Sequence, residues 1–62
     1  MSNELRTNFA IIIPAYNEEG RIAATISGIR KFTDADIIVI SDGSVDGTAN
    51  KARDAGANVI EL

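Results

Sequence analysis

The 62-residue chain has no cysteine and no histidine. Disulfide bonds and zinc sites built from cysteine and histidine, the usual supports of very small domains, are therefore excluded. A fold of this size buries only about 60% of the surface that its unfolded chain exposes. We therefore expect a single domain with a thin core, which gains further support from structure outside these residues.

Basic residues and long apolar runs are also scarce. The net charge is -3 and the lysines and arginines form no stripe, so we expect no nucleic-acid partner. The longest apolar run, residues 9–15, is far shorter than the roughly 20 residues that cross a bilayer. The first residues, MSNELRTN, are polar and do not resemble a secretory signal. These absences, together with the lack of cysteine, favour a cytoplasmic location.

Three apolar segments predict β-strands, over residues 9–13, 37–40 and 58–61. In the first two, apolar and polar residues do not alternate, which is typical of strands that are covered on both faces. Pro14 follows the first segment, and we expect it to end that strand because proline has no N–H to donate to a sheet.

Two segments between the strands predict α-helices. Residues 18–32 carry large apolar side chains at helical spacing. This stripe consists of Ile22, Ile26, Ile29 and Phe32. Residues 46–55 predict a second helix, followed by Gly56 as its expected C′ residue. The inward face of that helix would consist of Ala49, Ala52 and Ala55.

Polar side chains next to the helical segments predict where the helices begin. Asn17 is the expected N-cap of the first helix, and Glu18 and Glu19 suit the positive end of its dipole. Either Ser44 or Asp46 caps the second helix on the same grounds.

Strands that alternate with helical connections are expected to be parallel, with right-handed crossovers. We therefore predict an α/β fold, the βαβαβ half of a doubly wound, Rossmann-like parallel sheet with strand order 3-2-1. The first strand would lie at an open edge of this sheet. Such an edge predicts self-association of two copies or only marginal stability.

Two loops leave the same edge of the predicted sheet, IPAYNEEG at residues 13–20 and SDGSVDGT at residues 41–48. Ligands of open α/β sheets bind at this carboxyl edge. Asp42 stands at a strand end, where it either contacts a ligand or serves the turn, and Gly43 after it leaves room for a close approach. Tyr16 either stacks on a nucleobase or packs over the sheet edge.

Known phosphate and metal motifs do not fit these loops. The sequence contains neither GxGxxG nor GxxxxGK[ST]. DGSVDG matches the opening of a calcium-binding loop, but Arg53 stands at the twelfth position, where a bidentate glutamate is needed. We therefore expect no metal site in this chain. Ser44, Asp46, Gly47 and Thr48 are instead expected to be structural, since such residues are common in strand-to-helix loops.

Taken together, the two loops resemble the N-terminal segment of family 2 glycosyltransferases with the GT-A fold, particularly the dolichol-phosphate and polyprenyl-phosphate sugar synthases. The resemblance covers about residues 8–62. It implies that residues 9–62 are the N-terminal nucleotide-binding portion of a truncated GT-A domain and that residues 1–8 are a polar extension. The family usually has an aspartate at the position of Ser41, and we interpret this serine as a tolerated substitution.

The resemblance also implies a donor site. Pro14, Ala15 and Tyr16 would line the base and ribose of a UDP- or GDP-sugar, Glu18 would reach the nucleoside, and Asp42 would accept a hydrogen bond from the base. The family's DxD motif for Mg²⁺ or Mn²⁺, its general base and its acceptor site lie downstream of such a segment. We therefore expect no catalytic residue and no cofactor in this chain, and no activity from it alone.

The parent protein implied by the resemblance transfers a sugar from its nucleotide donor with inversion, and the resemblance suggests a polyprenyl phosphate as its acceptor. It would act in the cytoplasm or at the cytoplasmic face of a membrane, which it would reach through its acceptor or through regions outside this chain. The alternative is a stand-alone α/β module that binds a nucleotide or a partner without catalysis.

Overall fold

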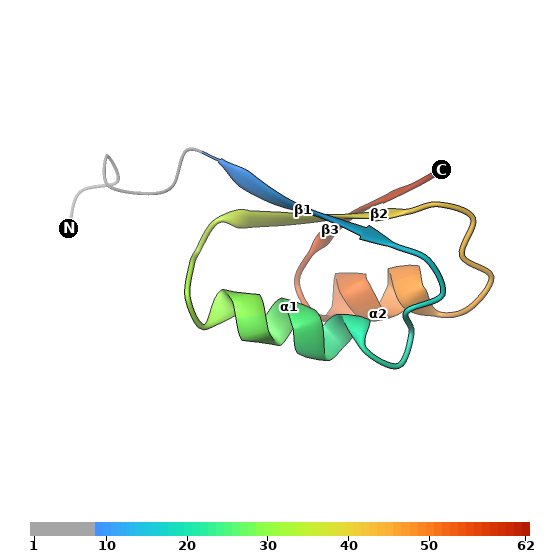
Figure 1. Ribbon diagram of the computed structural model, residues 1–62, viewed down its shortest axis with the longest axis horizontal. Coiled ribbons are helices and arrows are strands. Elements are labelled where there is room, and N and C mark those ends of the chain that lie inside the picture. The colour runs from blue at the N-terminus through green and yellow to red at the C-terminus, as the bar shows by residue number, and fades with distance from the viewer. Residues whose placement is uncertain (1–8) are drawn as a thin grey trace.

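The computed structural model describes residues 9–62, so the expected polar extension over residues 1–8 lies outside the described residues. Strands and helices alternate along the chain (Figure 1). The elements are β1 (Ala10–Ala15), α1 (Ile22–Arg30), β2 (Asp36–Ser41), α2 (Thr48–Asp54) and β3 (Asn58–Glu61). The order of elements and the α/β class are as predicted.

The strands form one parallel sheet in the order β1-β2-β3, which confirms the predicted strand order. Ala15 at the end of β1 is in register with Ser41 at the end of β2, and Ser41 with Glu61 of β3. The three strands therefore end together at one edge, from which the two polar loops emerge.

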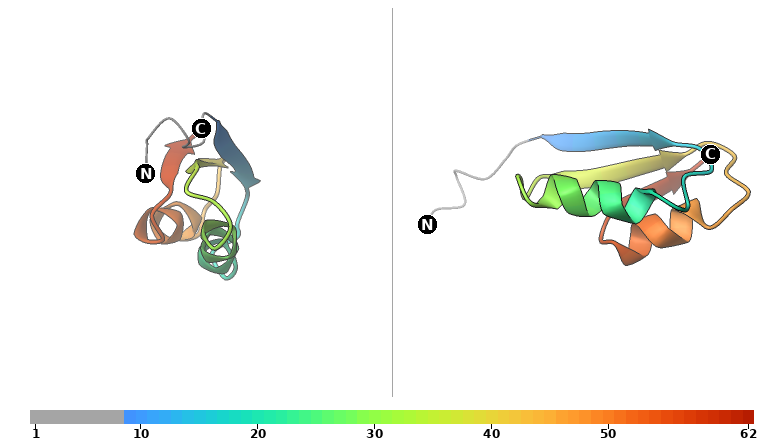
Figure 2. Two further views of the ribbon diagram at one scale, coloured as in Figure 1. Left: turned by 90° about the vertical axis from the view of Figure 1, so that its left-hand side faces the viewer. Right: turned by 60° about the horizontal axis from the view of Figure 1, so that its bottom comes forward.

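Both helices cover the same face of the sheet (Figure 2). The side chains that alternate toward this face of β2, Ile37 and Val39, are almost completely buried. Ile22 and Ile26 of α1 and Ala52 of α2 pack in the same core cluster. The alanine face of α2 was expected from the sequence, and its small side chains allow this helix to lie close to the sheet.

The opposite face of the sheet carries Ile12, Ile38, Ile40 and Ile60, which alternate with the core residues along the strands. Ile12 keeps 52% and Ile60 48% of its surface exposed. The apolar runs predicted strands covered on both faces, but among residues 9–62 helices cover only one of them (Figure 2). Within the same residues, no helix is long and apolar enough to cross a membrane.

Three expectations about element ends are wrong. β1 continues through Pro14 to Ala15. This is possible because β1 lies at the sheet edge, where the sheet does not need the N–H that proline lacks. α1 begins at Ile22 after an Arg21 N-cap without a side-chain cap bond, so Asn17 does not cap it. Phe32 lies beyond the end of α1 and is 89% exposed.

The expected C′ role of Gly56 is confirmed. Its φ angle is 98°, in the region that only glycine adopts without strain. The N–H of Gly56 donates to the carbonyl of Arg53, and the N–H of Ala57 donates to that of Ala52. This pair of hydrogen bonds is a Schellman motif, which ends α2 and turns the chain directly into β3.

Replacing Gly56 with Ala should therefore destabilise the fold by about 1–2 kcal/mol, the cost of a Cβ in a left-handed conformation. Gly28→Ala is the matched control, since a Cβ at this position in α1 meets nothing within 4 Å. The control should raise the free energy of unfolding by about 0.5–1 kcal/mol. Urea denaturation measures both values, and equal effects of the two substitutions would contradict the assigned C′ role.

Candidate functional site

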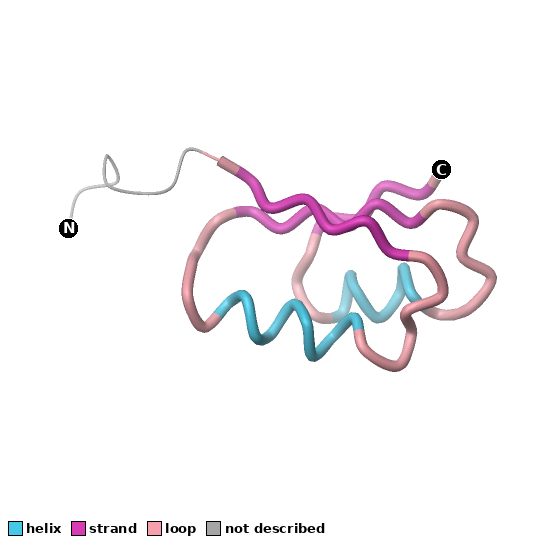
Figure 3. The backbone as a smooth tube through the Cα atoms, in the orientation of Figure 1, coloured by secondary structure: helices cyan, strands magenta, loops and turns pink. Residues whose placement is uncertain are grey.

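A pocket of about 450 Å³ opens at the carboxyl edge of the sheet. Figure 3 shows the loops after β1 and β2 at the same end of the molecule, together with the end of β3. The residues that line the pocket are Pro14, Ala15, Tyr16, Glu18, Ile40, Asp42 and Leu62. All five positions that the sequence assigned to a nucleotide site therefore border one pocket.

Parallel pairing of β1 with β2 brings the pocket residues at the ends of these two strands together. Pro14 lies opposite Ile40, and Ala15 lies opposite Ser41. The carbonyl of Ala15 accepts a hydrogen bond from the N–H of Asp42, at 3.4 Å. This bond continues the ladder by one residue and holds Asp42 beside the end of β1. Gly43, with φ at 73°, then turns the chain away from the sheet.

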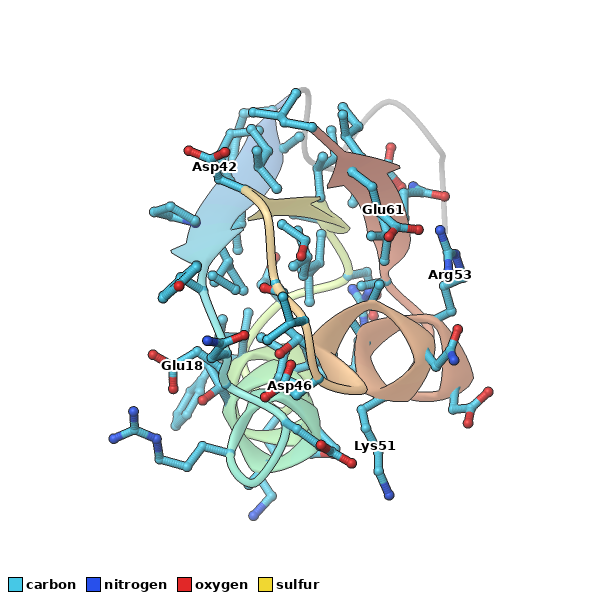
Figure 4. All side chains as sticks on the ribbon, turned by 90° about the vertical axis from the view of Figure 1, so that its right-hand side faces the viewer. Glu18, Asp42, Asp46, Lys51, Arg53 and Glu61 are labelled. Carbon is cyan, nitrogen blue, oxygen red and sulfur yellow. The ribbon has the colours of Figure 1, made fainter. Side chains whose placement is uncertain are left out.

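The side chains of Tyr16 and Asp42 are both open to solvent. Tyr16 keeps 62% of its surface exposed, so its ring is not buried against the sheet edge. Asp42 is exposed and does not cap α2, which begins after Gly47. In Figure 4, Asp42 lies on the side of the sheet away from the helices, whereas Glu18 and Asp46 lie toward the helices.

Glu18 occupies the boundary between the pocket and α1. Its backbone N–H donates to the Thr48 hydroxyl at 2.8 Å, and its carboxylate pairs with the Arg21 guanidinium. Glu18 also lines a second, smaller hollow of about 270 Å³ between β1 and α1. Its carboxylate therefore already has a cationic partner in this structure.

Hydrogen bonds join the two loops beside the pocket. The N–H of Asn17 donates to the Ser44 hydroxyl at 3.0 Å, and the Asn17 side-chain oxygen accepts from the N–H of Val45 at 3.0 Å. Asn17 adopts a φ of 51°, and it is the only residue other than glycine in the described chain with a positive φ. Its side-chain oxygen, the atom that would cap a helix, is therefore used between the loops, which explains why Asn17 does not cap α1.

A second group of hydrogen bonds joins the loops next to the helices. The N–H of Gly47 donates to the Glu19 carboxylate at 3.1 Å, and the N–H of Glu19 donates to the Asp46 carboxylate at 3.3 Å. Asp46 also accepts from the Thr48 N–H at 3.0 Å and from the Thr48 hydroxyl. The N-cap of α2 is Gly47, which has no side-chain cap bond, so neither Ser44 nor Asp46 stands at the expected cap position. Asp46, one residue before the N-cap, accepts from the first residue of α2, and Ser44 bonds to the other loop.

Two pocket residues were not identified from the sequence. Ile40 is the last apolar residue of β2, and Leu62 follows β3 with its N–H bonded to the Ser41 carbonyl at 2.9 Å. The rule that parallel strands end at one edge could have identified both, because each stands at a strand end. They add an apolar wall to the polar loops.

Among residues 9–62, no group of three or more carboxylates is arranged to hold a metal ion. The carboxylates of Asp46 and Glu19 are occupied by backbone N–H groups of the loops. The described residues therefore do not fit a divalent cation by themselves.

Hydrogen bonding lowers the pKa of Asp46 below its ordinary value of 3.8. The largest cause is the hydrogen bond from the Thr48 hydroxyl. Desolvation, the second cause, raises the pKa, and the backbone N–H groups of Thr48 and Glu19 lower it further. Because the charged form is the one that the loops bind, the folded chain keeps Asp46 ionised to lower pH than the unfolded chain does.

The lowered pKa of Asp46 makes the folded chain less stable as the pH falls. The stabilisation from Asp46 is fully present above pH 3.8 and is lost as the pH falls through the lower folded-state pKa. Asp46→Asn should therefore flatten the acid limb of the stability curve, as measured by urea denaturation at successive pH values below 3.8. Asp34→Asn, in the connection between α1 and β2, is the control. Identical acid limbs for Asp46→Asn and the unmodified chain would contradict the assignment.

Comparison with known proteins identifies the family. The sequence profile of glycosyl transferase family 2 matches residues 10–62. A 4,4'-diaponeurosporenoate glycosyltransferase of Staphylococcus aureus (strain USA300) is 49% identical over 53 residues, which are 84% of this chain and 14% of that protein. The glycosyltransferase AglJ of Haloferax volcanii is 48% identical over 50 residues, 81% of this chain and 16% of that protein.

Solved structures agree with the sequence comparison. Glucosyl-3-phosphoglycerate synthase from Mycobacterium tuberculosis, in complex with Mn²⁺, UDP and phosphoglyceric acid, superposes with a TM-score of 0.77 at 34% identity. The match covers 94% of this chain and 21% of that protein. The same enzyme with Mn²⁺, UDP-glucose and glycerol 3-phosphate gives a TM-score of 0.77 at 36% identity.

The fold and the two loops thus define a Rossmann-like α/β unit of the GT-A type, and the chain belongs to glycosyl transferase family 2. It spans about a sixth of the length of the curated relatives that it matches, at 14% to 16% of each.

Proposed function

We propose that this chain forms the donor-nucleotide portion of a family 2 glycosyltransferase that transfers a sugar from a nucleotide donor. One observation carries the proposal: Pro14, Ala15, Tyr16, Glu18 and Asp42 all border a single pocket at the carboxyl edge of a parallel sheet. This edge is where open α/β sheets bind their ligands. Family membership supports the same class of ligand.

The chemistry of the pocket suits a nucleoside. The exposed ring of Tyr16 offers a stacking face, and the exposed carboxylate of Asp42 is an acceptor for a base N–H. Pro14 and Ile40 supply apolar wall beside them. The Glu18 carboxylate is paired with Arg21 and can contact a ligand only from its exposed side. We therefore assign Glu18 to the rim of the site.

The donor is proposed to be a UDP-sugar in the first instance. Structural relatives at 34% to 36% identity have been solved with UDP and with UDP-glucose. A GDP-sugar is the other donor that the resemblance implied. The acceptor, which the resemblance suggests is a polyprenyl phosphate, and a site of action in the cytoplasm or at the cytoplasmic face of a membrane stay predictions.

Transfer requires groups that we assign to other parts of the enzyme. A divalent cation offsets the charge of a departing diphosphate, and a carboxylate base deprotonates the acceptor. The relative solved with Mn²⁺ and UDP supports a cation in the complete protein. We propose that its ligands, the base and the acceptor site lie outside these 62 residues. On this proposal the chain is a fragment that has no activity alone.

Self-association is a further part of the proposal. β1 forms one edge of the sheet and β3 forms the other, and among residues 9–62 each of them is paired on one side only. An open edge next to an uncovered apolar face favours pairing of two copies. Sedimentation of the purified chain should therefore show a concentration-dependent dimer, and a monomer at all concentrations would contradict this.

Asp42 provides the direct test of the donor site. In the complete protein that contains this chain, Asp42→Ala should weaken nucleotide-sugar binding by about 1–3 kcal/mol, because a buried polar group of the nucleotide loses its partner. Unfolding should change little, since Asp42 is exposed and outside the core.

Calorimetric titration with UDP-glucose and urea denaturation give the two quantities. Asp34→Ala, an exposed aspartate in the connection between α1 and β2, is the control and should alter neither. If Asp42→Ala unfolded the protein while the folded remainder bound the donor normally, the carboxylate would be structural instead.

A further inference from the structure

We propose that Asn17 and Ser44 are positioning residues that set the separation of Tyr16 and Asp42 in the pocket. This inference rests on the proposed function, because it concerns the geometry of the same nucleotide site. Asn17 directly follows Tyr16, and Ser44 stands two residues after Asp42. The two hydrogen bonds between their loops therefore lie immediately behind the side chains that would contact the nucleoside.

The two bonds are reciprocal. Asn17 donates its backbone N–H to the Ser44 hydroxyl and accepts the N–H of Val45 on its side-chain oxygen, each at 3.0 Å. Because one residue holds two successive residues of the facing loop, the loops are fixed in register as well as in distance. We call this pair of hydrogen bonds the Asn17 clasp.

The left-handed conformation of Asn17 makes the clasp possible. With φ at 51°, the chain reverses directly after Tyr16, so that the N–H and the side-chain amide of Asn17 both reach the second loop. Asparagine adopts this conformation more readily than other residues with a Cβ. Glycine would permit the same backbone but would lack the acceptor for Val45.

The remaining bonds between the loops do not replace the clasp. Glu19, Asp46 and Gly47 join the loops at their ends near the helices, and Asp46 lies on the helix side of the sheet, away from Asp42 (Figure 4). Asp42 and Gly43 separate the end of β2 from Ser44. Without the clasp, this stretch is held near Tyr16 only by the 3.4 Å bond from Asp42 to Ala15.

The clasp is exposed to solvent, so it contributes little to overall stability. Its expected effect is on the affinity for the nucleotide, which needs the Tyr16 ring and the Asp42 carboxylate at a fixed separation. Loss of one such bond should weaken UDP binding about 3- to 10-fold. Lower affinity with unchanged stability indicates a positioning role. A merely structural role would lower stability and leave the affinity of the folded protein unchanged.

The test uses variants of the complete protein that contains this chain, titrated with UDP and with UDP-glucose. Asn17→Gly removes the side-chain acceptor and keeps the backbone conformation, and Ser44→Ala removes the hydroxyl. Both should weaken binding about 3- to 10-fold. Ser44→Thr retains a hydroxyl and should therefore bind UDP with the affinity of the unmodified protein. Ser27→Ala, the same chemical change on the exposed surface of α1, is the control and should bind normally.

A double-mutant cycle with Asp42 decides the mechanism. If the clasp acts by positioning Asp42, Asn17→Gly should have little further effect on affinity in an Asp42→Ala background. Additive losses in the cycle, or unchanged binding by both Asn17→Gly and Ser44→Ala, would overturn the positioning role while leaving the nucleotide site intact.

A ligand-free measurement keeps the two proposals apart. Hydrogen exchange at the Val45 amide should be slow in the unmodified protein and faster in Asn17→Gly, with an unchanged unfolding midpoint. If the unmodified protein bound no nucleotide, the proposed function would fail and a slow Val45 amide would still support the clasp as a device that orders these loops. Fast exchange at Val45 in the unmodified protein would show that the clasp does not exist.

Discussion

Parallel pairing between β1 and β2 is the constraint on which the other features of this chain depend. It places Ala15 opposite Ser41, so that the chain leaves both strands at the same edge. A shift of the register by one residue would exchange the faces of the whole strand and move Ile37 and Val39 out of the core. The buried face therefore fixes the register, and the register fixes where the loops meet.

The loops then use their polar groups on each other and on Thr48, the first residue of α2. The N–H groups of Asn17 and Glu19 donate to side chains of the second loop, and that of Glu18 donates to the Thr48 hydroxyl at the start of α2. Backbone donors near a helix start would otherwise need a cap or water. Holding the loops in this way leaves Tyr16 and Asp42 free at the pocket, since neither side chain takes part in these bonds.

Much of this arrangement could be predicted from the sequence, and each failure has a physical reason. Unalternating apolar runs and a helical stripe predicted the strands and their order, because these patterns are local. Pro14 and Asn17 were misjudged because their environments are set by residues far away in the sequence, through the edge position of β1 and the bond from the Val45 N–H to the Asn17 side chain. Phe32 was misjudged because α1 ends at Arg30, before the last residue of the apolar stripe. At the pocket, the strand-end rule located Asp42, and the same rule applied to β2 and β3 would have located Ile40 and Leu62 as well.

The central claim is that the carboxyl edge of this sheet binds the nucleotide of a sugar donor. NMR titration of the isotope-labelled protein with UDP tests it most directly. Our account predicts saturable shifts at Tyr16, Asp42 and Gly43, with the amide signals at the opposite edge, near Asp36 and Asn58, unchanged. Saturable binding of UDP that shifts residues elsewhere and leaves Tyr16 and Asp42 unperturbed would contradict the account.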